Sequence, residues 1–517
     1  MDAHSPTAIF VFVTLSVVER YFKLHLTLLT SKRGSKVHIV AAKLGKKGLT
    51  LKKFERSPDF EAFDDMAFTL PVQYSFLPRF YRLASVSALS NMMVPLAGIV
   101  DIAFLGHLAD IRHLAGVVLA TILFDYLYRV LKFLRSSTNA LTAQAVGRDD
   151  SKAVLLAGLR SGLVALAIGV LIVLLQYPLQ KLGFAILSGS PEIEASGADY
   201  FCARIWGAPA VLLNFVLIGW FLGREMNGVV LLMSIMGNGS NVALDYLMIN
   251  KFGWASWGAG LATAASQYLA LITALICLCF TIQWKIVPNA LKEVFDWAAL
   301  KDTVVLKSNI LIRFLALISA YAIFTNISAA MGTTVLAENG LILQIALLSQ
   351  FTIQGVGMTA QTLTGNFKGK GDTQKLIPLL TVSVITSLLI SFGIAIASVM
   401  FPTAIFGLLT NHAEVNQHIS HYTIWLLPLL GFTSIAFMLE GYFIGLKEGA
   451  TLRNSVLIAF FLGFLPVAVT AWYLHNNHIL WLGLVSYMAT TMLALGINLP
   501  RTIGAFNQLS TEALTSN

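Results

Sequence analysis

Charged residues are scarce in this chain. Lys, Arg, Asp and Glu make up 12% of the 517 residues, against about 25% in soluble globular proteins, while hydrophobic residues make up 56%. This balance excludes a soluble globular fold and predicts a polytopic membrane protein. Strand patterns are also missing, because the apolar runs extend over about 20 to 30 residues without alternating. The backbone must then be satisfied within helices rather than in a barrel, so we expect an all-α membrane protein.

The sequence also has few of the residue patterns that are typical of redox cysteines, metal sites or catalytic sites. The three cysteines, Cys202, Cys277 and Cys279, lie in apolar runs without metal or redox spacing, so we expect them to pack against other helices. His418 and His421 could share a helix face, but no third ligand is evident, and we expect no metal site. The chain has no HExxH or GxSxG run, so it is not expected to be an enzyme.

The formal net charge of +9 is concentrated at the amino terminus. The first 60 residues hold 11 Lys or Arg against 4 acids, so the basic character belongs to one tail and does not indicate a nucleic-acid partner. We interpret residues 1–75 as a basic cytoplasmic extension that is disordered, or as the result of a start codon assigned too early. Five acids between positions 55 and 65 argue against a transit peptide.

Twelve apolar segments follow the extension, and each is long enough to cross a bilayer as a helix. The loops after the even-numbered segments hold thirteen Lys or Arg and the opposite loops hold three, so both termini should be cytoplasmic. The predicted spans are 84–108, 113–145, 152–177, 197–222, 227–249, 257–283, 304–331, 336–367, 374–401, 416–446, 451–473 and 478–499.

The sequence repeats itself. Thr142, Ala143 and Gln144 recur as Thr359, Ala360 and Gln361, 217 positions later, and GWFLG at 219 recurs as GYFIG at 441. We therefore predict two parallel lobes of six helices, related by a pseudo-two-fold axis along the membrane normal. The lobes would be residues 76–283 and 304–499, with a cytoplasmic linker at 284–303 and a cytoplasmic tail at 500–517. Such a pair of bundles suits alternating access.

The first span, Ala84 to Leu108, has Asp101 as its single carboxylate. Pro95 removes a backbone donor and Gly98 weakens the helix, so we expect a hinge just before Asp101. An ionised carboxylate at membrane depth is costly unless it is paired, hydrated or protonated, and such residues are candidates for function. The alternative is an Asp that only caps or hydrogen-bonds a neighbouring helix.

Five blocks of sequence carry a family resemblance. In chain order they are PLAGIVDIAFLGHL at 95, FLRSSTNALTAQAVG at 133, APAVLLNFVLIGWFLG at 208, NVALDYLMINKFGWASWGAGLATAASQ at 241 and LEGYFIGLKEGATLRNSV at 439. Together they resemble the multidrug and toxic compound extrusion (MATE) transporters, most closely the DinF-like branch. The resemblance covers about Leu83 to Leu499 and none of residues 1–75.

The resemblance implies an antiporter that exports amphipathic organic compounds while H⁺ or Na⁺ moves inward, with no cofactor besides the coupling ion. By position it implies a cation-coupling site at Asp101, Asn241, Asp245 and Thr263. The spacing agrees, because Asp101 and Asp245 lie at similar depths in helices of one direction, and Asn241 and Asp245 share a helix face. Two neighbouring carboxylates cannot both ionise cheaply, so one should hold a proton near the working pH. A purely structural hydrogen-bond network is the alternative.

Some positions depart from the family pattern or are ambiguous. Gln354 and Glu440 stand where the branch more often has Asp before Gly; Gln354 cannot titrate, so a second cation site in the carboxy-terminal half stays open. We count both, with Asn214, as candidates for the substrate cavity. Arg129, Lys132 and Arg135 form one basic helix face. These three could attract an anionic or zwitterionic headgroup, or could snorkel to the inner interface, which we favour because this end of the helix is cytoplasmic.

Two functions of different classes remain. The first is the cation-coupled antiporter, and the alternative is a flippase for a lipid or lipid-linked substrate with the same architecture, whose phosphate would bind the basic face of the second span. The partners we expect are a small amphipathic organic substrate and the bilayer, without nucleic acid, in a monomer. The plasma (inner) membrane is the expected location, and an organelle membrane stays open.

Overall fold

The computed structural model describes residues 71–106, 110–187, 190–406 and 419–515, with the backbone alone at 94–106 and after 502. The chain divides into two compact units, Met1–Ser75 and Phe76–Asn517. In the first unit the described part is a 3₁₀ helix, η1 (Val72–Tyr74), so the predicted disorder of 1–75 concerns residues outside those described. In the second unit the described residues form helices joined by turns, without a strand among them, which confirms the all-α prediction.

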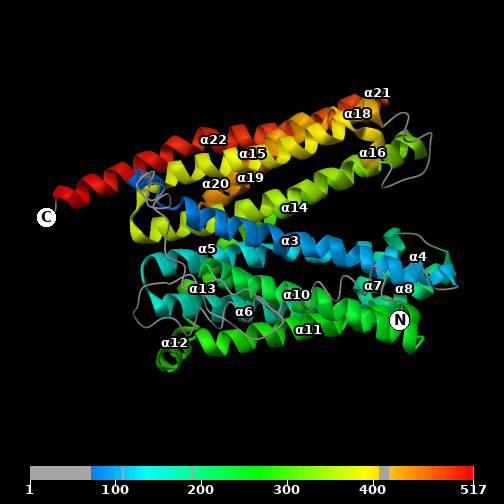
Figure 1. Cartoon of the computed structure of the whole chain (residues 1–517), viewed down its shortest axis with the longest axis horizontal. Helices are drawn as coiled ribbons and strands as arrows, with labels where there is room; N and C mark the ends of the chain where they lie inside the picture. The colour runs from blue at the N-terminus through cyan, green and yellow to red at the C-terminus, as the bar shows by residue number, and fades with distance from the viewer. Residues whose placement is uncertain (1–70, 107–109, 188–189, 407–418, 516–517) are drawn as a thin grey trace, which may run out of the picture. The chain divides into compact units, whose positions relative to one another are not determined.

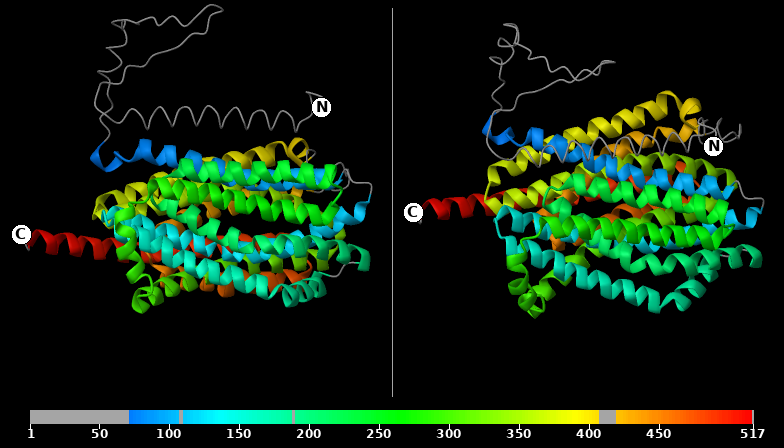
Figure 2. Two further views of the ribbon diagram at one scale, coloured as in Figure 1. Left: turned by 90° about the horizontal axis from the view of Figure 1, so that it is seen from below. Right: turned by 60° about the horizontal axis from the view of Figure 1, so that its bottom comes forward.

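The helices of the second unit run roughly parallel to one another (Figures 1 and 2). We call the first six spans the N-lobe and the last six the C-lobe. The N-lobe comprises α3 (Leu77–Gly106), α4 (Ile111–Leu131), α5 (Phe133–Gly147), α6 (Ser151–Leu174), α8 (Pro191–Arg204), α9 (Ala208–Gly223), α10 (Asn227–Asp245) and α11 (Ala255–Thr281). The C-lobe comprises α13 (Trp297–Met331), α14 (Thr333–Lys370), α15 (Leu376–Met400), α19 (Leu426–Gly445), α20 (Gly449–Ile458), α21 (Leu465–Leu474) and α22 (Asn477–Thr515).

Several spans are built from two pieces. α4 and α5 meet at Lys132, the 3₁₀ helix η2 (Ile205–Gly207) joins α8 to α9, and π-helical turns follow α10 (η3, Tyr246–Lys251) and separate α20 from α21 (η6, Ala459–Phe464). Shorter helices connect the spans: α7 (Gln176–Leu187), η4 (Trp284–Ile286), α12 (Val287–Glu293), η5 (Thr373–Lys375), α16 (Pro402–Phe406) and α18 (Ser420–Thr423). The predicted linker at 284–303 is therefore largely helical.

Where the structure describes them, the predicted spans are largely helical, and ten of the described segments are long and apolar enough to cross a membrane. The other two predicted spans are α3, which runs unbroken past Pro95 and Gly98, and α10, whose 19 residues are rich in Asn and Ser. The hinge at Pro95 stays a prediction because its side chain is outside the described residues. α22 continues past the predicted span end at 499 and projects beyond the other helices (Figure 1). Cys202 and Cys279 are exposed, so the expected packing is wrong for these two cysteines.

Four turns at one end of the bundle share a single backbone geometry. Each follows a helix, α5, α9, α14 or α19, and each places one residue at positive φ: Asp149 (57°), Glu225 (61°), Gly371 (80°) and Lys447 (64°). In each turn the next amide donates to the carbonyl five residues back, as Asp150 N does to Ala145 O and Asp372 N to Phe367 O, both at 3.0 Å. This is the Schellman ending of a helix. We call this end of the bundle the turn end.

The two lobes meet on the pseudo-two-fold axis through a pair of glycines. A Cβ on Gly147 would lie 2.8 Å from the Cα of Gly369, and a Cβ on Gly369 would lie 2.9 Å from the Cα of Gly147. Each added Cβ would lie closer still to a carbonyl oxygen, that of Asn366 or Gln144 respectively. The contact is reciprocal, as a two-fold axis requires, and no larger residue fits it without separating α5 from α14.

The glycine contacts correct the register of the repeat. Gly223 packs on Thr142 at 2.7 Å and Gly445 packs on Thr364 at 2.9 Å, measured from an added Cβ to the threonine Cβ. Thr142 is thus equivalent to Thr364, 222 positions later, and not to Thr359 as the recurring Thr-Ala-Gln run suggested. A five-residue slip turns a helix by about 140°, so it would move the contact to another face. The recurrence of GWFLG and GYFIG follows the register of the structure.

Many of the hydrogen bonds between the lobes lie near the turn end. Among the described residues, α5 and α14 exchange side-chain and backbone bonds with each other and with the neighbouring helices. Gln144 Nε2 donates to Gly445 O at 2.7 Å, Gln361 Nε2 to Ser136 O at 2.8 Å and Thr362 Oγ1 to Asn139 Oδ1 at 3.0 Å. Arg79, which pairs with Glu225 in the N-lobe, also donates to Asn366 Oδ1 at 3.2 Å in the C-lobe. These hydrogen bonds hold the two lobes together at the turn end and close this end of the bundle.

The glycine pair gives a first test. Gly147→Ala and Gly369→Ala should each destabilise the closed bundle by about 1–3 kcal/mol, because a methyl group has no room between the two backbones. Thermal unfolding of the purified chain in detergent measures this loss. Gly162→Ala on α6 is the control, since its Cβ would meet no atom within 4 Å. Equal midpoints for all three variants would contradict the close contact.

The turn at Lys447 gives a second test. Burial, with Arg148 and Lys368 as further causes, lowers the pKa of Lys447 from 10.5 to about 8. Between pH 8 and 10.5 Lys447 is protonated in the unfolded chain and neutral in the folded chain. The contribution of Lys447 to the free energy of unfolding therefore rises with pH over this range. Lys447→Gly should stabilise the chain at pH 7 by about 0.5–1 kcal/mol through relief of the positive φ.

Lys447→Met separates the two effects, because it retains the strained backbone and removes the charge. It should flatten the rise in unfolding midpoint between pH 8 and 10.5 relative to the wild type, while Lys447→Gly should both flatten the rise and raise the midpoint at pH 7. A Lys447→Met variant that retains the full rise would show that another group titrates in this window.

Candidate functional site

The N-lobe contains a buried carboxylate beside an amide. Asp245 is the last residue of α10 and is 1% exposed, and Asn241, one turn earlier, donates from Nδ2 to Asp245 Oδ2 at 3.0 Å. The spacing of four residues places both on one helix face, as the sequence indicates. The π-helical turn η3 begins directly after Asp245. π turns are frequent at functional sites because the extra residue redirects the side chains around it.

The other predicted members of the coupling site are less fully described. Asp101 lies on α3, which packs along α10, but its side chain is outside the described residues, as are those of Pro95 and Gly98. Thr263 lies on α11, which packs on the other side of α10, and its hydroxyl donates to Ala259 O at 2.9 Å. The pairing of Asp101 with Asp245 therefore stays a prediction.

Asn214 belongs to a polar contact between α9 and α11. Its Nδ2 donates to Gln267 O at 2.9 Å and to Gln267 Oε1 at 3.3 Å, while its own Oδ1 is buried without a donor. Gln267 lies one helical turn after Thr263, so both project from the same side of α11. This contact brings a second amide pair to the helix that carries Thr263.

In the C-lobe, Glu440 on α19 forms an ion pair with Arg313 on α13. Both side chains are 7% exposed, and the Arg313 guanidinium lies over the rings of Phe314 and Phe437, 4.5 and 5.3 Å from their centroids. Sequence reasoning identified Glu440 but left its partner undetermined. A buried carboxylate requires a cation, so the sequence indicated that Glu440 has a cationic partner but not which residue it is.

Gln354 lies opposite the basic face of the second span. Arg135 on α5 donates from Nη1 to Asn91 Oδ1 at 3.3 Å and from Nη2 to Gln354 Oε1 at 3.5 Å. The ammonium group of Lys132 lies 5.6 Å from the ring centroid of Phe351. The structure thus brings Arg135 of the N-lobe to Gln354 of the C-lobe, two candidates that the sequence could not connect.

Lys307 is a residue whose position the sequence misjudged. We counted it among the cytoplasmic loop cations, but it lies inside α13 and is 2% exposed. Its Nζ donates to Ser137 Oγ at 3.1 Å and to Ser161 Oγ at 3.0 Å, both in the N-lobe. Lys307 therefore links the two lobes through two serine hydroxyls. Its position within the span of α13 is the sequence signal that could have revealed this buried site.

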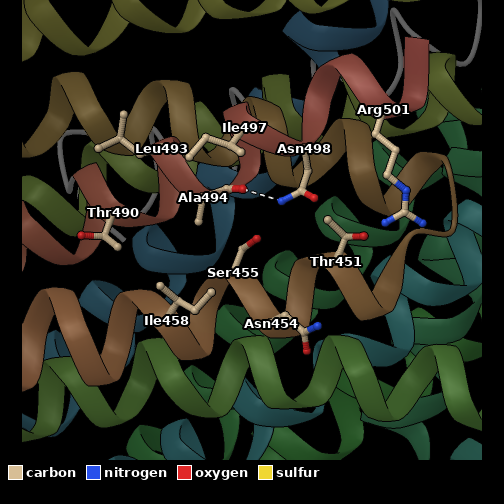
Figure 3. A pocket seen from close by; sticks show the side chains of 10 residues that line it. All are labelled: Thr451, Asn454, Ser455, Ile458, Thr490, Leu493, Ala494, Ile497, Asn498 and Arg501. Atoms are coloured by element: carbon tan, nitrogen blue, oxygen red, sulfur yellow. Dashed lines mark hydrogen bonds between the residues drawn. The ribbon is translucent and has the colours of Figure 1, made fainter. Parts of the chain in front are cut away.

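Two cavities lie apart from these residues. One, of about 480 Å³, lies between α20 and α22, where Thr451, Asn454, Asn498 and Arg501 project from one end and Ile458, Leu493 and Ile497 from the other (Figure 3). The second, of about 290 Å³, lies at the turn end beside Trp220 and Arg224. Neither contains a predicted site residue. Within the described ranges no three His, Cys, Asp or Glu side chains form a metal-binding group.

Two lobes of parallel spans, duplicated at a fixed register and joined on the axis, with a buried carboxylate in one lobe, define an integral multi-pass membrane transporter. The family model for MatE matches residues 87–247 and again 310–470. The chain therefore belongs to the MATE family, the multidrug and toxic compound extrusion transporters. The two matches fall one in each lobe, in agreement with the repeat.

Similar proteins cover most of the membrane part. DNA damage-inducible protein F of Escherichia coli (strain K12) is 28% identical over 417 residues, which are 80% of this chain and 90% of that protein. Protein DETOXIFICATION 44, chloroplastic, of Arabidopsis thaliana is 25% identical over 435 residues, 80% of each chain. A solved MATE transporter in an outward-facing conformation superposes with a TM-score of 0.74 at 18% identity, covering 83% of this chain and 96% of that one. That likeness shows the shared fold.

The ion pair between Arg313 and Glu440 gives a third test. Arg313→Met should cost about 3–5 kcal/mol of stability, because it leaves a buried carboxylate without its cation. The double variant with Glu440→Met should be more stable than Arg313→Met alone. As a control, Lys152→Met breaks an exposed pair with Glu293 and should cost about 1 kcal/mol or less. Chemical denaturation in detergent checks the order, which would be reversed if Arg313 made no buried pair.

Proposed function

We propose that this chain is a secondary active antiporter that exports amphipathic organic compounds in exchange for H⁺ or Na⁺. The observation that supports this most directly is the buried Asp245 carboxylate with its Asn241 amide in a duplicated bundle. A carboxylate within a membrane span is costly, and a proton or a sodium ion that binds there lowers the cost. Binding of the ion and the arrangement of the helices around it are therefore coupled.

The two lobes provide the second requirement of an antiporter, which is access from one side at a time. The contact at Gly147 and Gly369 and the hydrogen bonds around it close the turn end. The excess of Lys and Arg in the loops at this end supports a cytoplasmic location for it and for both termini. The described conformation would then be the one that faces outward.

The proposed cycle follows from these two features. An ion from outside binds between Asp101 on α3 and Asp245 on α10, and Asn241 and Thr263 contribute amide and hydroxyl oxygens. The π-helical turn after Asp245 is a place where α10 can change its winding when the carboxylate is neutralised. That change, passed to α3, would release the lobes at the turn end, and the ion leaves toward the cytoplasm.

The membrane and the assembly state belong to the same proposal. A single chain contains both lobes, so a monomer in the plasma (inner) membrane suffices, with no cofactor besides the coupling ion. An organelle membrane is the alternative location. A flippase for lipid or lipid-linked substrates is the alternative function, and the observation in its favour is the set of cations on the second span, which would suit a phosphate.

Asp245→Asn gives a fourth test. In proteoliposomes with an imposed pH or Na⁺ gradient, gradient-driven transport of ethidium should fall about tenfold or more, because the amide cannot exchange the coupling ion. Asp101→Asn should behave in the same way. The matched control is Asp199→Asn, an exposed residue on α8, which should transport normally.

Transport at fixed pH with and without Na⁺ separates the two coupling ions. Normal gradient-driven transport by Asp245→Asn would refute the coupling site. A lipid translocation assay in the same vesicles tests the flippase: gradient-independent movement of a fluorescent phospholipid would favour it over the antiporter.

A further inference from the structure

We infer that Arg129, Lys132 and Arg135, which face Asn91, Tyr321 and Gln354 between the lobes, bind the charged end of an anionic amphipathic substrate. The inference deepens the proposed function, since it rests on transport of an amphipathic compound and adds the sign of its charge.

The depth of the three cations argues against an interfacial role. The second span runs from Arg112 to Gly147, and Lys132 lies at the junction of α4 and α5, 20 residues after its start and 15 before its end. At about 1.5 Å per residue, Lys132 is roughly 22 Å from the nearer end of the span. A membrane core of about 30 Å centred on this span would begin about 12 Å from its end, which places Lys132 about 10 Å inside the core.

The three cations lack the partners that structural cations have. No carboxylate among the described residues lies within 4 Å of any of them; the acid nearest along the helix, Asp125, is exposed and forms no ion pair with Arg129. Arg135 has only two long bonds to neutral amide oxygens, and its buried Nε has no acceptor. The contact of Lys132 is the ring of Phe351. By contrast, Arg313 and Arg79 in the same bundle each bind a carboxylate, although Arg313 Nε, like Arg135 Nε, is buried without an acceptor.

Neutral polar groups from other helices surround the same place. Asn91 comes from α3 and Gln354 from α14, and both accept from Arg135. Tyr321 on α13 lies within electrostatic range of Arg129, and its hydroxyl accepts from Gln350 Nε2 at 2.5 Å. Three other spans, α3, α13 and α14, therefore supply neutral polar groups and no carboxylate in contact with the three cations. The ring of Phe351 beside Lys132 provides apolar surface for the rest of an amphipathic molecule.

Cations at this depth are costly unless they are paired or hydrated, and such residues are candidates for function. An anion that enters between the lobes supplies what is missing: negative charge for Lys132 and Arg129, and an acceptor for Arg135 Nε. A cationic substrate would instead add to the repulsion among the three. The side chains are partly exposed, so a ligand can reach them from the space between the lobes.

The test uses two probes of matched shape and opposite charge, tetraphenylborate and tetraphenylphosphonium. Equilibrium dialysis with the purified full chain in nonionic detergent measures binding without any ion gradient. Tetraphenylborate should bind more tightly than tetraphenylphosphonium. Lys132→Gln and Arg135→Gln should each weaken tetraphenylborate binding about tenfold and leave tetraphenylphosphonium binding unchanged or stronger. The matched control, Lys301→Gln, removes an exposed cation on α13 and should change neither.

Lys132→Arg keeps the charge and should retain tetraphenylborate binding, which separates charge from packing. Preference of the wild type for tetraphenylphosphonium would overturn the inference without any variant, as would a Lys132→Gln variant with unchanged anion binding. Competition by phosphatidylglycerol, but not by phosphatidylcholine, would identify the anion as a lipid headgroup; competition by neither would identify a soluble organic anion. Because no gradient is present, loss of coupling in Asp245→Asn and loss of anion binding here are independent results.

Discussion

The close approach of α5 and α14 at Gly147 and Gly369 is the constraint on which the arrangement of the two lobes depends. Two helices can touch through their backbones only where neither carries a Cβ, and here each glycine lies against the backbone of the opposite helix. This contact fixes the register of the repeat and brings Gln144, Gln361 and Thr362 within hydrogen-bonding distance of the opposite lobe. The interface also has apolar contacts: Met358 packs in a cluster with Trp220, and the rings of Phe76 and Phe367 lie 5.8 Å apart.

The repeat preserves backbone geometry while the side chains diverge. The four Schellman turns are alike, yet the residue at positive φ is Gly in one and Asp, Glu or Lys in the others. In the register of the structure, Arg135 is equivalent to Gly357 and Lys132 to Gln354, so the basic face exists in the N-lobe only. Glu440 and Arg313 have no counterparts of the same charge at Ile218 and Asn91. The backbone of the two lobes is therefore symmetric, whereas their charged and polar side chains are not.

The hydrophobicity of the sequence predicted where the helices lie. It did not predict the helix breaks, the π turns or the register of the repeat, which depend on contacts in the folded chain. The described parts of the twelve predicted spans are largely helical, because apolar runs in a membrane must satisfy their backbone internally. The break at Lys132 and the π turns at 246–251 and 459–464 were not predicted, since neither has a local signature in residue type. The register was wrong by five residues because an identical tripeptide was weighed more heavily than the glycines that set the helix contact.

In the candidate site, too, the sequence predicted contacts between residues close in the chain and missed contacts between distant ones. Asn241 and Asp245 could be paired from their spacing alone, because helical neighbours are encoded locally. The pairs Arg135 with Gln354 and Arg313 with Glu440 join residues 219 and 127 positions apart, and no local rule connects them. Lys307 was counted with the loop cations although it lies near the start of the predicted span 304–331; helix ends are the least certain boundaries in a sequence, and a few residues decide whether a lysine is in water or between lobes.

The salt link of Arg313 to Glu440 has an electrical consequence. A guanidinium keeps its charge at any working pH, so the charge of Glu440 is permanently neutralised and this pair adds no charge to what the carrier moves. With one coupling ion entering through the N-lobe and an anion leaving, both movements displace positive charge toward the cytoplasm. An inside-negative voltage favours each of them by about 2.3 kcal/mol per charge per 100 mV. Voltage, in addition to the concentration difference of the coupling ion, would then drive export.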